Sequence, residues 1–248
     1  MVHLLNIGNT NTQIAGLADG RPAAPAVVAT DGLRAGTLPP CVGTALSGPC
    51  LVASVVPAVS ARLRAAACAE VVFLHADLVC EVDFSGVDAS TLGADRVANA
   101  VAAAVEIAGP ALVLDCGTCV TTEAVDGARR FRGGAILPGR RLWRQALRDH
   151  TGQLPEIPLR FECPTALGTC TADAIAAGVD LGILGAVERL VAESRAKLGA
   201  PSCPVVVVGG DAGYFCRHLA GVTAGGADFT LRGLAHVAVR VFGQRRLV

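Results

Sequence analysis

One pattern of residues occurs twice in this chain, and it restricts the folds that the chain can adopt. Residues 3–20 read HLLNIGNTNTQIAGLADG, and residues 111–127 read ALVLDCGTCVTTEAVDG. Each copy contains an apolar strand, a glycine turn with a threonine, a second strand and an Asp-Gly pair typical of hairpin turns. The repeat predicts a duplicated α/β protein with an N-terminal half over residues 1–109 and a C-terminal half over residues 110–248.

The rest of the chain also has the pattern of an α/β protein. Short β-rich runs alternate with alanine-rich runs that have helical character. We expect further strands over residues 50–56, 70–75 and 203–210. We expect helices over residues 57–68, 91–108, 140–150, 171–197, 211–219 and 231–241.

The two glycine turns are candidate phosphate-binding loops. At a glycine, backbone N–H groups can approach phosphate oxygens without a Cβ in the way, and Thr or Asn side chains add donors. One such turn could equally be an ordinary hairpin, but two equivalent turns favour a nucleotide site. Alignment of Gly8 with Gly117 places Asn6 opposite Asp115, and a carboxylate at such a strand end can hold a metal ion or its waters. The Gly-Gly pair at 209–210 is a candidate shelf for adenosine.

Composition argues against several other classes of protein. The 21 basic residues balance the 21 acidic ones, so no net charge favours nucleic acid or an anionic membrane. Lys197 is the only lysine, so no glycine loop contains the lysine of a P-loop. Ten cysteines without a secretory signal predict reduced, buried thiols. Prolines interrupt the longest uncharged stretch, residues 35–61. We expect a soluble cytoplasmic protein that crosses no membrane.

Seven motifs give the chain a resemblance to a known family over nearly its whole length. They are NIGNTNT (6–12), ASVVP (53–57), LGADRVANAVAA (92–103), DCGTCVT (115–121), GGAILPG (133–139), GTCTADAIAAG (168–178) and VVGGDA (207–212). Their order resembles that of the type III pantothenate kinases, which belong to the acetate and sugar kinase, Hsp70 and actin superfamily. The resemblance implies duplicated ribonuclease H-like (actin-like ATPase) halves with an ATP cleft between them.

The resemblance also implies an activity. Type III pantothenate kinases use ATP to phosphorylate pantothenate to 4'-phosphopantothenate, which is the first step of coenzyme A biosynthesis. Members of the family act as homodimers and need Mg²⁺ and a monovalent cation, K⁺ or NH₄⁺. The expected partners of this chain are therefore pantothenate, ATP and a second copy of the chain.

The family motifs assign roles to residues of this chain. Asp95 would be the general base, Arg96 would bind the pantothenate carboxylate, and Asp115 would hold the monovalent cation. The residues implied in ATP binding are Asn6, Ile7, Gly8, Asn9, Thr10, Asn11, Thr12, Gln13 and Thr118. Those implied in pantothenate binding are Gly93, Ala94, Asp95 and Arg96, with Thr171 contacting substrate across the dimer interface.

The chemistry of Asp95 and Arg96 fits these roles. A carboxylate near the substrate hydroxyl can accept its proton during phosphoryl transfer, and a guanidinium binds a carboxylate through a planar pair of donors. The alternative for Asp95 is a charge at a helix N-terminus that the helix dipole favours. We favour the catalytic role because such a cap would give the adjacent Arg96 no purpose.

Asn6 is the main departure from the family, which has Asp at this place. An asparagine keeps one acceptor oxygen but loses the charge, so Mg²⁺ would be held more weakly. This leaves a second function open: a non-catalytic or weakly active relative that binds ligand and acts as a regulatory, accessory-factor-like protein. A family tyrosine before Gly93 is also missing, and Phe84 is the nearest aromatic residue.

Two further features have alternative interpretations. Cys116 and Cys119 form a C-x-x-C pair of the redox or zinc type, but no second pair follows at zinc-ribbon spacing, so we favour coincidence. An arginine-rich stretch could contact nucleic acid, but interleaved acidic residues favour a solvated face or a dimer surface. Its members are Arg129, Arg130, Arg132, Arg140, Arg141, Arg144 and Arg148.

Overall fold

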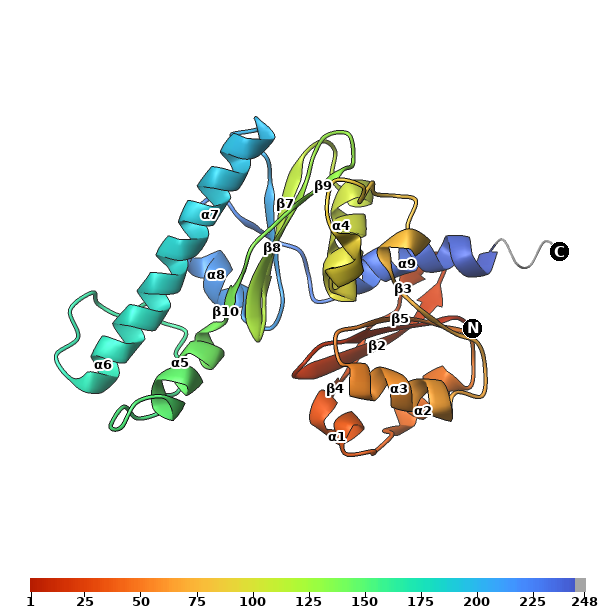
Figure 1. The fold of residues 1–248 in the computed structure, drawn as a ribbon, viewed down its shortest axis with the longest axis horizontal. Helices are drawn as coiled ribbons and strands as arrows, with labels where there is room; N and C mark the ends of the chain where they lie inside the picture. Colours follow the sequence, from red (N-terminus) through yellow and green to blue (C-terminus); the bar gives the residue numbers. More distant parts are fainter. Residues whose placement is uncertain (244–248) are drawn as a thin grey trace. The chain divides into compact units, whose positions relative to one another are not determined.

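The computed structural model describes residues 1–243, and these divide into two compact units (Figure 1). Unit 1 contains residues 1–109, residues 127–132 and the chain from Asp228 onward. Unit 2 contains residues 110–126 and 133–227. Within the described residues, no helix combines the length and the apolar character that a membrane crossing would need.

Unit 1 is built on a mixed sheet with the strand order β3-β2-β1-β5-β6, in which β4 also pairs with β2. Strand β1 is antiparallel to β2 and parallel to β5, and β5 is parallel to β6. The strands are β1 (His3–Ile7), β2 (Asn11–Ala18), β3 (Arg21–Pro22), β4 (Ala26–Ala29), β5 (Cys50–Ser54) and β6 (Val71–Phe73).

Helices of unit 1 cover both faces of this sheet. They are α1 (Thr30–Arg34), α2 (Pro40–Leu46), α3 (Pro57–Ala66), α4 (Ala94–Glu106) and α9 (Phe229–Gly243), with 3-10 turns at Ala76–Leu78 and Ala89–Thr91. Alternate residues Leu5 and Ile7 of β1 lie in one core cluster with residues of α1, α2 and α3. Leu4, directly before Leu5, is also fully buried. Burial on both faces explains why β1 and β5 are almost continuously apolar.

Helices α4 and α9 pack very closely against each other. The backbone of Gly233 on α9 lies so near α4 that an added Cβ would be 1.9 Å from the Ala98 carbonyl oxygen. The buried Thr230 hydroxyl donates to Asn99 Oδ1 at 2.8 Å, and Arg232 pairs with Glu106 at 2.9 Å. The C-terminal helix is therefore an integral part of unit 1.

Unit 2 repeats the arrangement of unit 1. Its sheet has the order β10-β8-β7-β11-β12, with β7 antiparallel to β8 and parallel to β11. The strands are β7 (Ala111–Cys116), β8 (Cys119–Val125), β10 (Ile136–Pro138), β11 (Val205–Val208) and β12 (Thr223–Ala224). Strand β9 (Phe131–Gly133) also pairs with β8, but its first two residues are counted in unit 1. The helices are α5 (Arg140–Asp149), α6 (Thr171–Ala176), α7 (Gly182–Leu198) and α8 (Ala212–His218), with a π-helical turn at Ala177–Leu181.

The predicted duplication and α/β fold are confirmed. In each copy the central strand has an antiparallel partner on one side and a parallel partner on the other. Asn6 of β1 pairs with Gln13, and Asp115 of β7 pairs with Thr121. Both residues are second from last in their strands, so the predicted equivalence of Asn6 and Asp115 also holds.

The division between units differs from the expected single boundary after residue 109. Residues 228–243 return to unit 1 because α9 packs on α4. Residues 127–132 also belong to unit 1, because Asp83 N–H donates to the Arg129 carbonyl and Phe131 N–H donates to the Asp83 carbonyl, both at 2.9 Å.

The connection after the second Asp-Gly pair differs from that after the first, because residues 129 and 131 bond to Asp83. In the first copy, Asp19 and Gly20 have positive φ values of 49° and 75° and close a two-residue hairpin between β2 and β3. In the second copy, residues 126–130 connect β8 to β9, and Arg129, with φ 58°, adopts the left-handed conformation. A turn at Gly127 and Ala128 thus follows β8, but the connection is longer than the two-residue hairpin of the first copy.

The close contact between α4 and α9 can be tested with alanine substitutions at two helical glycines. Gly233→Ala should lower the free energy of unfolding by about 1–3 kcal/mol, because its methyl group would overlap the Ala98 carbonyl. Gly185→Ala on α7, where nothing lies within 4 Å of the added carbon, should raise it by about 0.5–1 kcal/mol. Urea unfolding of both variants measures the difference; equal stability of the two would contradict the packing described here.

Candidate active site

The first glycine turn connects β1 to β2 through residues 8–10. Gly8 N–H donates to the Asn11 carbonyl at 3.0 Å, which closes the turn. Asn9, Thr10 and Asn11 are exposed, as residues of a phosphate-binding loop must be. The structure thus brings the predicted ATP-binding residues 6–13 together in one strand–turn–strand segment.

Asn6 lies at the base of this turn and has one free acceptor. Its Nδ2 donates to Gln13 Oε1 at 3.2 Å, which is the residue opposite it in β2. Its Oδ1 is buried and has no hydrogen-bond partner within the described part of the chain. A buried acceptor without a partner is costly, so this oxygen is suited to bind a cation or a water molecule.

Thr30 supports the turn from behind and was not predicted as part of the site. It is fully buried, its hydroxyl donates to the Gly8 carbonyl at 2.8 Å, and it lies 3.0 Å from the Thr12 hydroxyl. Its backbone N–H also donates to the Thr10 carbonyl at 2.9 Å. Nothing in the local sequence marks Thr30, because its role depends on the pairing of β4 with β2.

Asp95 lies in the first turn of α4, beside a glycine that makes room for it. A Cβ on Gly93 would be 2.7 Å from Asp95 Oδ1. Burial raises the pKa of the Asp95 carboxyl, while the Arg96 backbone N–H, which donates to Oδ1 at 2.8 Å, and the Arg96 charge oppose that rise. A buried carboxylate whose pKa is raised in this way is a stronger base than a solvated one.

Contacts within unit 1 place the start of α4 and the first turn at the same edge of the sheet. Val55, directly after β5, donates its N–H to the Ile7 carbonyl at 3.1 Å. The Val55 side chain in turn lies 3.4 Å from the position of a Cβ on Gly93. Because β1 and β5 are parallel, their carboxyl ends meet there, as is common for ligand sites in α/β sheets.

An aromatic pair lies near Arg96. The Phe84 and Phe131 rings are 5.4 Å apart, and the Arg96 guanidinium is 5.9 Å from the Phe131 ring centroid. Phe84, the aromatic residue closest in sequence to the missing family tyrosine, is thus buried beside a second ring that lies nearer to Arg96. Phe131 could not be identified from sequence, because it reaches unit 1 through the displaced segment 127–132.

The second glycine turn, at Gly117 and Thr118, is enclosed by backbone on two sides. Gly139 N–H donates to the Thr118 carbonyl at 2.9 Å, and a Cβ on Gly139 would lie 2.3 Å from the Gly117 carbonyl. Gly209 has φ 93°, and a Cβ there would lie 2.6 Å from Asp115 Oδ1. Only glycine fits at either of these two places. The Gly-Gly pair and the glycine before α5 therefore hold Asp115 and Thr118 in place.

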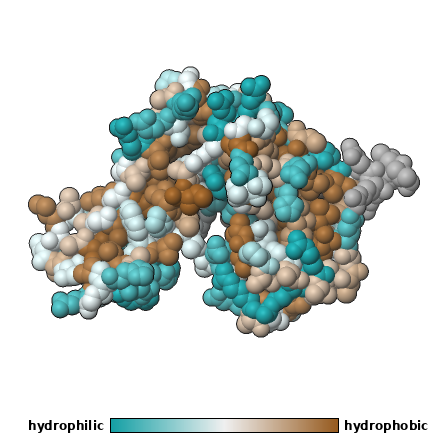
Figure 2. Space-filling model, in the orientation of Figure 1, coloured by the Kyte–Doolittle hydropathy of each residue, from teal (hydrophilic) through white to brown (hydrophobic). Residues whose placement is uncertain are grey.

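Thr171 lies elsewhere in unit 2. It is the exposed first residue of α6 and lines a cavity of about 450 Å³ whose other walls are mostly apolar. The lining residues are Trp143, Leu147, Leu154, Thr171, Ala174, Ile175, Gly178 and Val179. Apolar surface gathers around α5 and α6 in this part of unit 2 (Figure 2).

The structure also bears on the Cys116 and Cys119 pair and on the arginine-rich stretch. Cys116 is buried, burial and the nearby Asp115 charge raise its thiol pKa, and it is not in a disulfide. No group of three or more His, Cys, Asp or Glu residues in the described chain could hold a metal ion. A buried thiol with a raised pKa does not favour a redox role for this C-x-x-C pair. The arginine stretch is not a continuous solvated face, because Arg140 and Arg144 are each only 2% exposed and form ion pairs.

Comparison with known proteins agrees with these features. The profile of the type III pantothenate kinases matches residues 3–193. The chain belongs to this family. A type III pantothenate kinase of Rubrobacter xylanophilus is 38% identical over 151 residues, which are 59% of this chain and 57% of that relative. One from Treponema pallidum is 40% identical over 147 residues, 59% of this chain and 53% of the relative. The chain thus matches little more than half the length of these kinases.

Several solved structures share the fold of this chain. A Campylobacter jejuni protein of the Baf family of transcriptional activators superimposes with a TM-score of 0.67 at 17% identity, covering 97% of this chain and 99% of that one. The activator of 2-hydroxyisocaproyl-CoA dehydratase from Clostridium difficile, with bound ADPNP, gives 0.51 at 15% identity over 99% and 95%. MreB 5 of Spiroplasma citri, bound to AMPPNP, gives 0.51 at 9% identity over 98% and 97%. The actin-like ATPase fold expected from the motifs is confirmed.

Proposed function

We propose that this chain transfers the γ-phosphoryl group of ATP to the primary hydroxyl of pantothenate, the first step of coenzyme A biosynthesis. Family membership supports this reaction class. The observation that carries the proposal is the partly buried Asp95 carboxylate at the start of α4, on the sheet edge that also bears the first glycine turn. We did not find an observation that favours the alternative of a non-catalytic regulator.

Asp95 acts as the general base in this proposal. As the pantothenate hydroxyl attacks the γ-phosphorus and the bond to ADP breaks, the hydroxyl proton passes to the Asp95 carboxylate. Arg96 binds the pantothenate carboxylate, and Gly93 and Ala94 form the backbone beside it. Burial raises the pKa of the Asp95 carboxyl, and the Arg96 charge offsets part of that rise.

ATP is bound by residues 6–13 and by Thr118 in this proposal. The exposed residues of the first turn support a role with phosphates. Mg²⁺ fits this site through the unpartnered Asn6 Oδ1, a neutral oxygen, together with phosphate oxygens of ATP. Mg²⁺ is commonly bound in this way, with few protein ligands, and it would supply charge neutralisation for phosphoryl transfer.

Asp115 is the proposed ligand of a monovalent cation, K⁺ or NH₄⁺. The carboxylate is fixed by the close backbone of Gly209, which supports a role that needs a defined oxygen position. Thr171 is proposed to contact pantothenate from the second subunit of a homodimer. Support for the dimer comes from the resemblance and from the apolar cavity that Thr171 lines.

The proposed reaction is tested by following 4'-phosphopantothenate formation with ATP, Mg²⁺ and K⁺. Asp95→Asn should lower kcat by about 10²–10⁴-fold, because the base is lost. Asn6→Asp should raise kcat, since it adds a charged ligand for Mg²⁺. An inactive native chain that becomes active as Asn6→Asp would refute the enzyme proposal for the native protein, and full turnover by Asp95→Asn would refute the assignment of the base.

A pH profile tests the environment of Asp95. A base must be deprotonated, so kcat/KM for pantothenate should fall as pH drops through the raised pKa of Asp95. Arg96→Gln removes a charge that lowers this pKa, so the acid limb should move to higher pH even though activity falls. An unmoved acid limb in Arg96→Gln would contradict this account.

The raised pKa of Asp95 also affects stability. The native state binds the proton more tightly than the unfolded chain, so the stability that this group contributes is lost as pH rises through the raised pKa. Asp95→Asn should therefore melt no lower than the native protein at neutral pH.

A further inference from the structure

A buried group of charged residues lies behind the second glycine turn, with Arg140 at its centre. The Arg140 Nε donates to Asp180 Oδ1 at 2.9 Å, and Nη1 donates to both carboxylate oxygens of Asp211 at 3.0 and 3.2 Å. Its Nη2 donates to the Arg160 carbonyl at 2.5 Å, and the guanidinium lies 3.4 Å from the Tyr214 ring centroid. The planar guanidinium thus holds three separate segments of unit 2 at once.

On one side, Arg140 holds the turn at residues 209–211. Asp211, its carboxylate partner, directly precedes α8, and Asp211 N–H donates to the Cys116 carbonyl at 2.9 Å. Two residues earlier, the Gly209 backbone lies against Asp115 and Cys116, where a Cβ would be 2.6 Å from Asp115 Oδ1 and 2.5 Å from the Cys116 carbonyl. A shift of Asp211 would therefore move the backbone that confines the Asp115 carboxylate.

On the other side, Arg140 is bonded directly to the glycine that contacts the turn. Gly139 precedes α5, donates to the Thr118 carbonyl and leaves no space for a Cβ beside Gly117. The ion pair from Arg140 to Asp211 therefore joins the two backbone segments, residues 139–140 and 209–211, that enclose residues 115–118. These two segments are about 70 residues apart in sequence, and Arg140 is the side chain that connects them.

We propose that Arg140 is a positioning residue for nucleotide binding, which keeps residues 139 and 209–211 closed around Asp115, Gly117 and Thr118. This inference rests on the proposed function, in which the second glycine turn contacts ATP. Arg140 itself touches neither nucleotide nor pantothenate in this account. Its loss should weaken ATP binding without altering residues 93–96 of unit 1, where pantothenate is proposed to bind.

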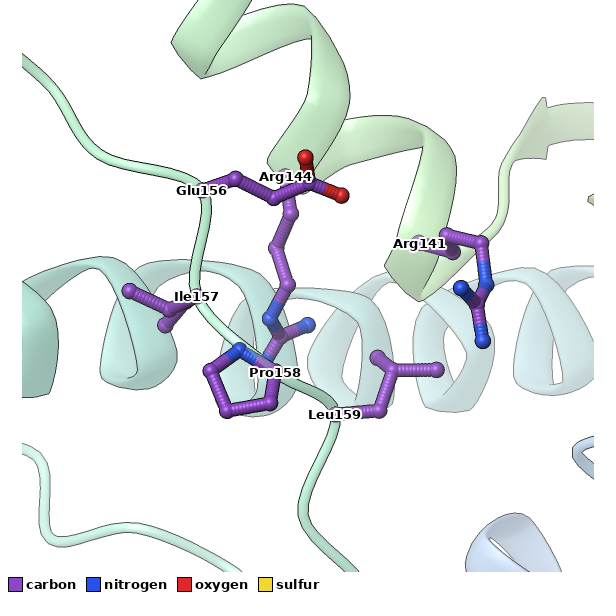
Figure 3. A pocket seen from close by; sticks show the side chains of 6 residues that line it. All are labelled: Arg141, Arg144, Glu156, Ile157, Pro158 and Leu159. Carbon is purple, nitrogen blue, oxygen red and sulfur yellow. The ribbon is translucent and has the colours of Figure 1, made fainter.

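Arg144 provides a matched control on the same helix. It is as buried as Arg140, and its Nη2 donates to the other oxygen of Asp180 at 2.7 Å. Figure 3 shows the Arg144 side chain passing behind the segment that carries Ile157, Pro158 and Leu159. Arg144 donates hydrogen bonds to Asp180 and to the Arg140 carbonyl. Substitution of Arg144 disturbs the same buried charges without cutting the connection to Asp211.

The test compares Arg140→Met and Arg144→Met by isothermal titration with AMPPNP and Mg²⁺, together with melting temperatures. Both variants should melt below the native protein, because each leaves Asp180 short of a partner. Only Arg140→Met should bind AMPPNP more weakly, with Kd raised at least tenfold. In enzyme kinetics, only Arg140→Met should raise KM for ATP, and its KM for pantothenate should change less than twofold. In Arg144→Met, Kd for AMPPNP should stay within twofold of the native value.

Four outcomes would overturn the inference. An unchanged Kd in Arg140→Met, or an equal rise in both variants, would show that Arg140 acts only on stability. Absence of AMPPNP binding to the native protein would overturn the proposed function and this inference with it. If Arg140→Met does not fold, Arg140→Lys and Arg144→Lys replace the pair. The single nitrogen of an ammonium cannot reproduce the three spread nitrogens of the guanidinium that bind Asp180, Asp211 and the Arg160 carbonyl. Arg140→Lys should therefore still raise Kd several-fold, and an unchanged Kd would refute the proposal.

Discussion

The pairing of each central strand, antiparallel on one side and parallel on the other, is the constraint on which the rest of the structure depends. It brings the carboxyl ends of β1 and β5 to one sheet edge in unit 1, and those of β7 and β11 to one edge in unit 2. Helix α4 in unit 1 and helix α8 in unit 2 start near these edges. Polar residues that are far apart in sequence therefore meet at one edge within each unit.

Sequence was sufficient for the parts of the fold that depend on local pattern. The two copies of strand, glycine turn and strand predicted the duplication, and the alanine-rich run after Gly93 predicted α4. It failed where distant segments decide the structure. Residues 127–132 join unit 1 through Asp83, and α9 joins it through close packing of Gly233 on α4. Neither contact leaves a periodic signal in the residues nearby.

The same distinction holds for the candidate site. Residues 6–13, Asp95 and Asp115 stand in recognisable motifs, and the environments of Asn6 and Asp95 fit their proposed roles. The residues that support the site were missed. Thr30 is a single threonine outside every motif, and Arg140 was predicted to be a surface arginine. Removal of one partner from a buried ion pair typically costs about 3–5 kcal/mol, so the structural effect of Arg140 is large although it lies outside the motifs.

The central claim is that both copies of the duplicated turn bind the phosphates of one nucleotide, although only the second copy has a carboxylate. Amide hydrogen exchange with and without AMPPNP and Mg²⁺ tests this most directly. The account predicts slower exchange in peptides that contain residues 8–11 and in peptides that contain residues 117–118, with no matching change in the exposed loop at 151–153. Protection confined to one turn, or absent from both, would contradict it.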